Sequence, residues 1–280
     1  MTKNISTEFR KNLHLPFFII SLIGLNLLFF TSEAVKGSDG KGYSVWSILT
    51  MSKRLPLTSR LEFGWLSLWQ AGLGPWTLLA APVICCAGFI YCNAEEKKNR
   101  AECFIKIRQR RITFTFGKVL SGIVCAGLTL TAAYVLFGLI LYPFFPKPDA
   151  YRESFGSVVD MTYGSSTALY VLKNLAGVFL LGCFMSLLPV ILSSFLDDPY
   201  LLVSLPVLGT YLYERVIQRM YFTTFGMEHA DILEALNLEG LPHVFDMPRR
   251  GISLVTLLLL IGSCFILYHL IRFKRRDELI

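Results

Sequence analysis

Six apolar runs, separated by polar segments of very different lengths, dominate the pattern of the chain. A helix of about 20 apolar residues is long enough to cross a hydrocarbon layer of about 30 Å. The fifth run is short and contains Pro206, which leaves open whether all of it crosses. The pattern therefore predicts an all-α polytopic membrane protein with six transmembrane helices, at about 15–34, 73–92, 119–143, 168–195, 200–213 and 251–273.

The polar segments also carry structural signals. Residues 1–14 place Ile5, Phe9 and Leu13 about one turn apart among basic residues, which predicts an interfacial amphipathic helix. The outer segments 35–72, 144–167 and 214–250 are rich in aromatic residues, so we expect helical segments that pack as a lid. Within the first of them, 43–51 and 61–69 predict surface helices with tryptophans at the membrane–water interface. The LDDP turn after the fourth run predicts an antiparallel hairpin.

Composition and charge place this fold in a membrane and orient it. The 280 residues are 54% hydrophobic and 17% charged, which is more apolar than a soluble surface allows. The termini, 93–118 and the LDDP turn together hold 15 of the 27 Lys and Arg residues and 8 of the 20 acids, which leaves 12 of each elsewhere. The positive-inside rule then places both termini in the cytoplasm. We expect one transmembrane domain over 1–280 in the lipid bilayer of a bacterial cell (plasma) membrane, with no nucleic-acid partner.

The most basic polar segment, 93–118, reads NAEEKKNRAECFIKIRQRRITFTFGK. It contains eight Lys and Arg residues and three Glu residues. Ala101, Phe104 and Ile105 recur at helical spacing, which predicts a short helix with one apolar face. Such a helix can lie on anionic lipid headgroups or dock on a protein partner, and the sequence pattern leaves both open.

Motifs for cofactor chemistry were sought along the whole sequence. No phosphate-binding loop of the G-x-x-x-x-G-K-[ST] type occurs, so an ATPase activity would have to belong to another chain. The four histidines are scattered and no paired C-x-x-C occurs, so we expect no metal site and no cofactor in this chain. The seven cysteines lie in apolar runs or in the basic segment and indicate no disulfide framework.

One pattern is typical of an enzyme. Glu95, Glu96 and Arg100 fit E-E-x-x-x-R, and Phe225 with His229 fits F-x-x-x-H; both resemble signatures of intramembrane proteases. A shared catalytic water would require these groups to converge. The charge distribution instead places the glutamates and the histidine on opposite sides of the membrane, so we expect no catalytic residues.

The layout resembles the membrane subunit of type-2 (ABC-2-like) ATP-binding-cassette exporters. The shared features are an interfacial N-terminal helix, six spans with both ends inside, a basic loop between spans two and three, and a tight inner turn between spans four and five. The acidic start of 93–118 and its end, with Arg110, Arg111, Phe114 and Lys118, are similar to the family's loop before span three. The sequence departs from the family at Asn99-Arg100-Ala101, where a Ser-Gly or Gly-Thr pair is usual.

This resemblance implies a permease that exports a substrate, such as a peptide, a lipid or an antimicrobial compound. The partners implied are a separate cytoplasmic ABC ATPase subunit, which would bind ATP and Mg, and a second copy of the permease or a homologous one. In the family this loop is a coupling helix that rests in a cleft of the ATPase. The coupling residues implied here are Glu95, Glu96, Arg100, Phe104, Ile105, Arg108, Arg110 and Arg111.

Polar residues inside apolar runs are the candidates for a substrate path. The candidate residues are Asn26, Thr129, Lys173, Asn174 and Ser186. Helix packing is the alternative explanation for polar or small residues at such positions. Two other functions stay open beside the permease. They are an intramembrane protease, and a membrane sensor or immunity protein that transports nothing.

Overall fold

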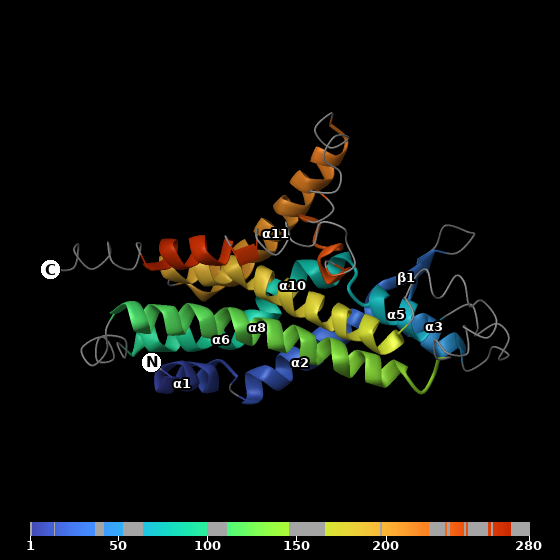
Figure 1. The fold of residues 1–280 in the computed structure, drawn as a ribbon, viewed down its shortest axis with the longest axis horizontal. Helices are drawn as coiled ribbons and strands as arrows, with labels where there is room; N and C mark the ends of the chain where they lie inside the picture. The colour runs from blue at the N-terminus through green and yellow to red at the C-terminus, as the bar shows by residue number, and fades with distance from the viewer. Residues whose placement is uncertain are drawn as a thin grey trace.

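The computed structural model describes residues 2–13, 15–36, 42–52, 64–99, 111–145, 166–196, 198–223, 233, 236–243, 245, 257–258 and 260–269. Most of these residues are helical. The long helices are α2 (Leu15–Thr31), α6 (Pro75–Lys98), α8 (Arg111–Leu141), α10 (Thr167–Phe195) and α11 (Pro199–Tyr221). Figure 1 shows α2, α6, α8 and α10 running side by side along the long axis of the molecule.

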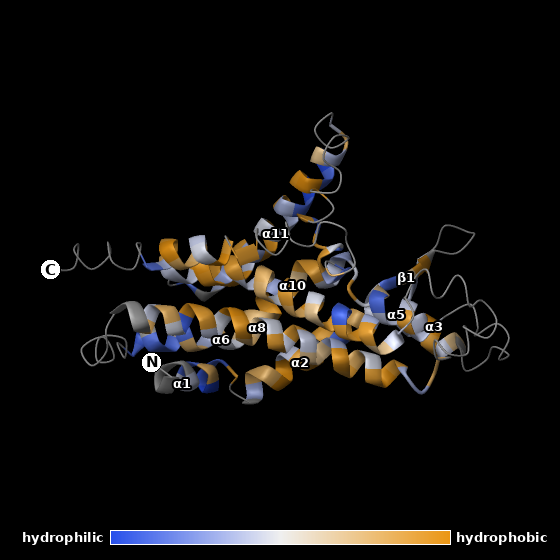
Figure 2. Ribbon diagram, viewed as in Figure 1, coloured by the Kyte–Doolittle hydropathy of each residue, from blue (hydrophilic) through white to orange (hydrophobic). Residues whose placement is uncertain are grey.

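Helix α8 forms the centre of this bundle. Its residues Ala126, Leu130, Tyr134 and Phe137 have no exposed surface, and α8 contacts α1, α2, α6 and α10. A further apolar helix, Leu260–His269, packs beside α8 and α10, with the rings of Phe265 and Phe116 5.5 Å apart. Figure 2 shows the hydrophobic residues spread along the bundle and hydrophilic residues concentrated near its two ends.

Three helical segments in the described part are each long and apolar enough to cross a membrane, namely Pro75–Glu96, Phe114–Leu141 and Thr167–Phe195. They coincide with the predicted spans at 73–92, 119–143 and 168–195. Helix α2, at the predicted first span, meets the length requirement only together with the helix before it, across a bend of 54°. Helix α11 is longer than the predicted fifth span and continues through Pro206, but Glu214, Arg215 and Arg219 make its last turns polar. These turns leave the bundle (Figure 1).

The two ends of the bundle differ. Helix α1 (Thr2–Asn12) lies at one end, which we call the α1 end, with the last turn of α6 and the first turns of α8. At the opposite end, a two-stranded antiparallel sheet joins β1 (Glu33–Lys36) to β2 (Gly42–Ser44), with Val35 opposite Tyr43. We call this the hairpin end. The described residues are mostly helical, as predicted, but these two short strands were not predicted; they pair the β-branched Val35 with the aromatic Tyr43.

The hairpin end also contains the two predicted surface helices, observed as α3 (Val45–Ser52) and α5 (Trp65–Ala71). Helix α5 is not confined to the surface, because Leu66, Leu68 and Trp69 are buried. The indole nitrogens of Trp65 and Trp69 donate to the carbonyls of Gly138 and Tyr134 on α8, both at 2.8 Å. These bonds tie α5 to successive turns of α8.

The segment 236–243, with the 3₁₀ turn η1 (Leu241–His243), covers the hairpin end of α10. The approach is close because Gly177 has no side chain. A Cβ atom at this position would lie 2.1 Å from the carbonyl oxygen of Pro242. Among the described residues, α3, α5 and 236–243 thus pack against the helices α2, α8 and α10, respectively.

Candidate functional site

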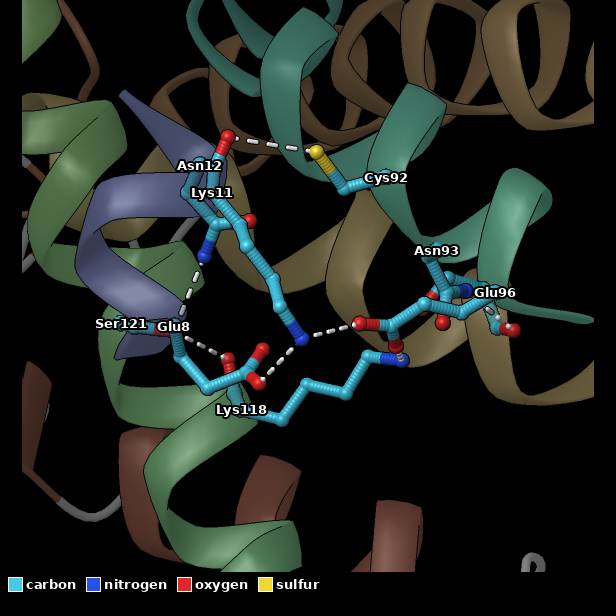
Figure 3. Close-up of polar contacts among 9 residues, drawn as sticks. Glu8, Lys11, Asn12, Cys92, Asn93, Glu96, Lys118 and Ser121 are labelled. Carbon is cyan, nitrogen blue, oxygen red and sulfur yellow. Dashed lines mark hydrogen bonds and ion pairs between the residues drawn. The ribbon is translucent and has the colours of Figure 1, made fainter. Parts of the chain in front are cut away.

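Four charged residues form a chain of ion pairs where α1, α6 and α8 meet (Figure 3). The Lys11 Nζ lies 2.9 Å from the Glu8 Oε1 and 2.7 Å from the Glu96 Oε1. The Lys118 Nζ lies 2.6 Å from the Glu96 Oε2. Glu96 therefore joins a lysine of α1 to a lysine of α8, and we call Glu8, Lys11, Glu96 and Lys118 the ion network.

The ion network is largely removed from solvent. Lys118 is 2% exposed, Glu8 7% and Glu96 9%. Burial alone acts to lower the pKa of Lys11, but the carboxylates of Glu96 and Glu8 outweigh it and raise that pKa above its usual value. Two cations and two anions balance, so the network can be buried only while each charge keeps its partner.

Uncharged contacts hold α1 in the same place. The Asn12 amide nitrogen donates to the Ser121 hydroxyl at 2.9 Å, and the Cys92 thiol donates to the Lys11 carbonyl at 3.2 Å. The backbone of α1 reaches α6 at Gly88, where a Cβ atom would lie 2.3 Å from the Asn12 carbonyl oxygen. Helix α1 is therefore seated on α6 and α8 by steric fit as well as by charge.

The structure describes three of the eight predicted coupling residues. Glu95 is exposed on the last turn of α6, whereas its neighbour Glu96 is buried in the ion network. Arg111 is the first residue of α8. The remaining ones lie outside the described residues, namely Arg100, Phe104, Ile105, Arg108 and Arg110. The polar loop is shorter than the predicted 93–118, because 93–98 continue α6 and 111–118 begin α8.

The partners of Glu96 were missed by the sequence analysis. Lys11 is one of the basic residues around Ile5, Phe9 and Leu13 in the predicted interfacial helix, and Lys118 is one residue of the family-like motif. The sequence offers only a weak signal at Lys118, which directly precedes an apolar run, because a lysine at the end of a span can also extend to the membrane surface.

Three of the predicted path residues form hydrogen bonds within the helix bundle. The hydroxyls of Thr129 and Ser186 donate to carbonyls of their own helices, those of Cys125 and Cys183. Asn26 donates to the Leu22 carbonyl of its own helix and, at 3.4 Å, to the Ala133 carbonyl of α8. These contacts favour the packing alternative for the three residues.

Lys173 and Asn174 occupy different positions on α10. Lys173 is half-buried, whereas Asn174 is 1% exposed and donates to the Tyr134 hydroxyl at 3.2 Å. Asn174 also lines a cavity at the hairpin end. It is thus a predicted path residue that borders an open space.

Glu96 and His229 belong to the protease-like pattern. Both carboxylate oxygens of Glu96 contact ammonium groups, which makes this residue an ion-pair partner rather than a free base. His229 lies outside the described residues. Within the described ranges, no group of three or more His, Cys, Asp or Glu side chains could hold a metal ion.

The chain was also compared with known proteins. No protein-family model matches it. A search of curated proteins finds no match either. A function for the chain is therefore argued from its own residues and from the geometry of the α1 end.

Proposed function

We propose that the chain is the membrane-spanning permease subunit of an ABC-2-like exporter, and that a separate subunit hydrolyses ATP. The observation that carries the proposal is the ion network. It fixes the interfacial helix α1 to the two helices, α6 and α8, that flank the basic segment 99–110. A partner that moves this segment would therefore move α1, α6 and α8 together.

Helix α8 can carry such a movement across the membrane. With 31 residues it is about 46 Å long, at about 1.5 Å per residue, and one face of its middle, with Ala126, Leu130 and Tyr134, is fully buried. At its far end it accepts hydrogen bonds from Trp65 and Trp69 of α5. A tilt imposed at the α1 end would therefore reach the hairpin end through a continuous, packed element.

The proposed partners follow from the same layout. The α1 end would face the cytoplasm, where the excess of basic residues places it, and the ATPase would bind ATP and Mg there. Apolar residues remain exposed on α2 and α11, among them Ile20, Leu27, Leu208 and Val216, as expected for contact with lipid or with a second permease subunit. A second copy or a homologous permease would complete the path, because six helices alone seldom enclose one.

Docking of the ATPase on the basic segment is tested by two variants. Replacement of both Phe104 and Ile105 by Asp would place charge in a desolvated cleft, and we expect loss of binding to the ATP-binding-cassette subunit. Lys97→Gln is the control and should bind like the parent. The measurement is co-purification of that subunit from membranes, identified by its sequence, together with ATP hydrolysis of the complex. Normal binding by a correctly inserted double Asp variant would exclude 99–110 as the docking element.

The proposed orientation predicts which positions are reached from outside. In a chain without its native cysteines, a cysteine at Lys41 should react with a membrane-impermeant maleimide in intact cells. A cysteine at Asn99 should react only after the membrane is opened. Labelling of position 99 in intact cells would reverse the orientation and would contradict a cytoplasmic ATPase at the α1 end.

A further inference from the structure

The ion network divides into two neutral pairs. The Glu8 carboxylate lies 2.9 Å from the Lys11 ammonium on the same helix, α1, and the Glu96 carboxylate lies 2.6 Å from the Lys118 ammonium between α6 and α8. The contact of Lys11 with Glu96, at 2.7 Å, joins the two pairs (Figure 3). If α1 leaves the bundle by breaking this contact, each of the four charges therefore keeps a partner.

This division lowers the cost of separating α1 from the bundle. Breaking a buried ion pair is expensive mainly when one charge stays buried without a counter-charge. Here the departing helix carries Lys11 together with Glu8, and the bundle keeps Lys118 together with Glu96. The Lys11 side chain is already 33% exposed in the docked position, so water can take over its lost contact.

The other contacts of α1 with the bundle are largely polar. The Asn12 amide donates to the Ser121 hydroxyl, and the Cys92 thiol donates to the carbonyl of Lys11. The apolar side chains of Phe9 and Leu13 are only partly buried. The largest fully buried side chains of the described residues all belong to other helices. Elements with little buried apolar surface open at a lower cost than the core does.

The chain geometry gives α1 a way to move by itself. A bend of 54° separates the helix over 6–12 from the helix over 16–31, so α1 is a separate rigid element beside α2. The close approach of the Asn12 carbonyl to Gly88 gives α1 a defined seat on α6 to return to.

We propose that α1 is a latch, which releases from α6 and α8 and docks again as a unit while the bundle stays folded. The juxtaposition that carries the proposal is that of one neutral ion pair on α1 with a second neutral pair on the bundle. In the proposed exporter, docked α1 would move with α6 and α8 and released α1 would not, but release itself does not depend on that function.

The test is double electron–electron resonance on the full-length chain in lipid nanodiscs. Spin labels are placed at Ser6→Cys on α1 and at Glu95→Cys on the last turn of α6, two exposed positions. The native cysteines are replaced, with Cys92→Ser so that a donor to the Lys11 carbonyl remains. Docked α1 gives one short distance between the labels, and released α1 adds a longer one.

Three variants change the ratio of released to docked chains. Ser121→Ala removes the acceptor of the Asn12 amide and should make the longer distance visible. In that chain, Lys11→Met removes the contact that joins the pairs and should raise the ratio about tenfold. Lys118→Met should instead lower the ratio about threefold or more, because Lys11 becomes the partner that Glu96 loses on release. In a network that cannot divide, removal of either lysine would loosen α1.

Lys98→Met is the matched control, because Lys98 is an exposed lysine at the end of α6. It should change the ratio by less than about twofold. Two results would overturn the proposal. One is a single short distance in the chain with both Ser121→Ala and Lys11→Met, and this result decides the matter by itself if Lys118→Met does not fold. The other is a ratio that Lys118→Met raises or leaves unchanged.

Discussion

Glu96→Gln should destabilise the folded chain by about 3–5 kcal/mol, the range measured when one partner of a buried ion pair is removed. The carboxylate of Glu96 contacts two ammonium groups, those of Lys11 and Lys118, at 2.7 and 2.6 Å. Without it, Lys11 keeps its contact with Glu8 at 2.9 Å, but Lys118, which is only 2% exposed, loses the carboxylate that it contacts in the ion network. The measurement is the midpoint of thermal unfolding in detergent, together with tryptic cleavage near α1.

Two further variants make this prediction specific. Glu95→Gln changes the neighbouring, exposed carboxylate and should alter stability by no more than about 0.5 kcal/mol. The double change Glu96→Gln with Lys118→Met removes the buried cation as well and should recover most of the loss. If Glu96→Gln proves as stable as Glu95→Gln, the ion network does not hold α1 to the bundle.

Gly88→Ala should release α1 from α6 without changing any charge. In an open helical position this substitution stabilises a protein by up to about 1 kcal/mol. At Gly88 the new Cβ atom would lie 2.3 Å from the backbone oxygen of Asn12, so α1 has to shift. We expect a loss of about 1–3 kcal/mol, as for other overpacked sites, and faster trypsin cleavage after Lys11.

Gly24→Ala in α2 is the matched control for this steric effect. The nearest atoms to a Cβ at that position belong to Ile84 and are 3.8 Å away, which is ordinary contact. This variant should be as stable as the parent or slightly more stable. If trypsin cleaves the Gly88→Ala protein after Lys11 no faster than it cleaves the parent, α1 does not lie where the ion network places it.

The apolar runs gave reliable helices where they were long and uninterrupted, as in 119–143 and 168–195. Their ends were less predictable, because α6 and α8 extend through the charged residues 93–98 and 111–118. These turns are polar in sequence, yet a buried ion network stabilises part of them. The strands 33–36 and 42–44 were missed because three or four residues are too few to show an alternating pattern.

The candidate site was predictable only in part, for a geometric reason. The E-E pair was noticed, but the two glutamates point in directions about 100° apart on a helix, and only Glu96 faces the bundle. Its partner Lys11 is 85 residues distant in the sequence. Helical periodicity finds neighbours three or four positions apart, whereas such a contact depends on how the helices pack.

The bonds from Trp65 and Trp69 to α8 have a spectroscopic consequence. All four tryptophans of the chain belong to the hairpin end, in α3, α5 and the first turn of α6. Their intrinsic fluorescence therefore does not respond directly to structural changes that are confined to the surroundings of Lys11 and Glu96. If the proposed complex forms with an ATPase that contains no tryptophan, a change in this emission on addition of nucleotide would report a structural change that has reached the hairpin end.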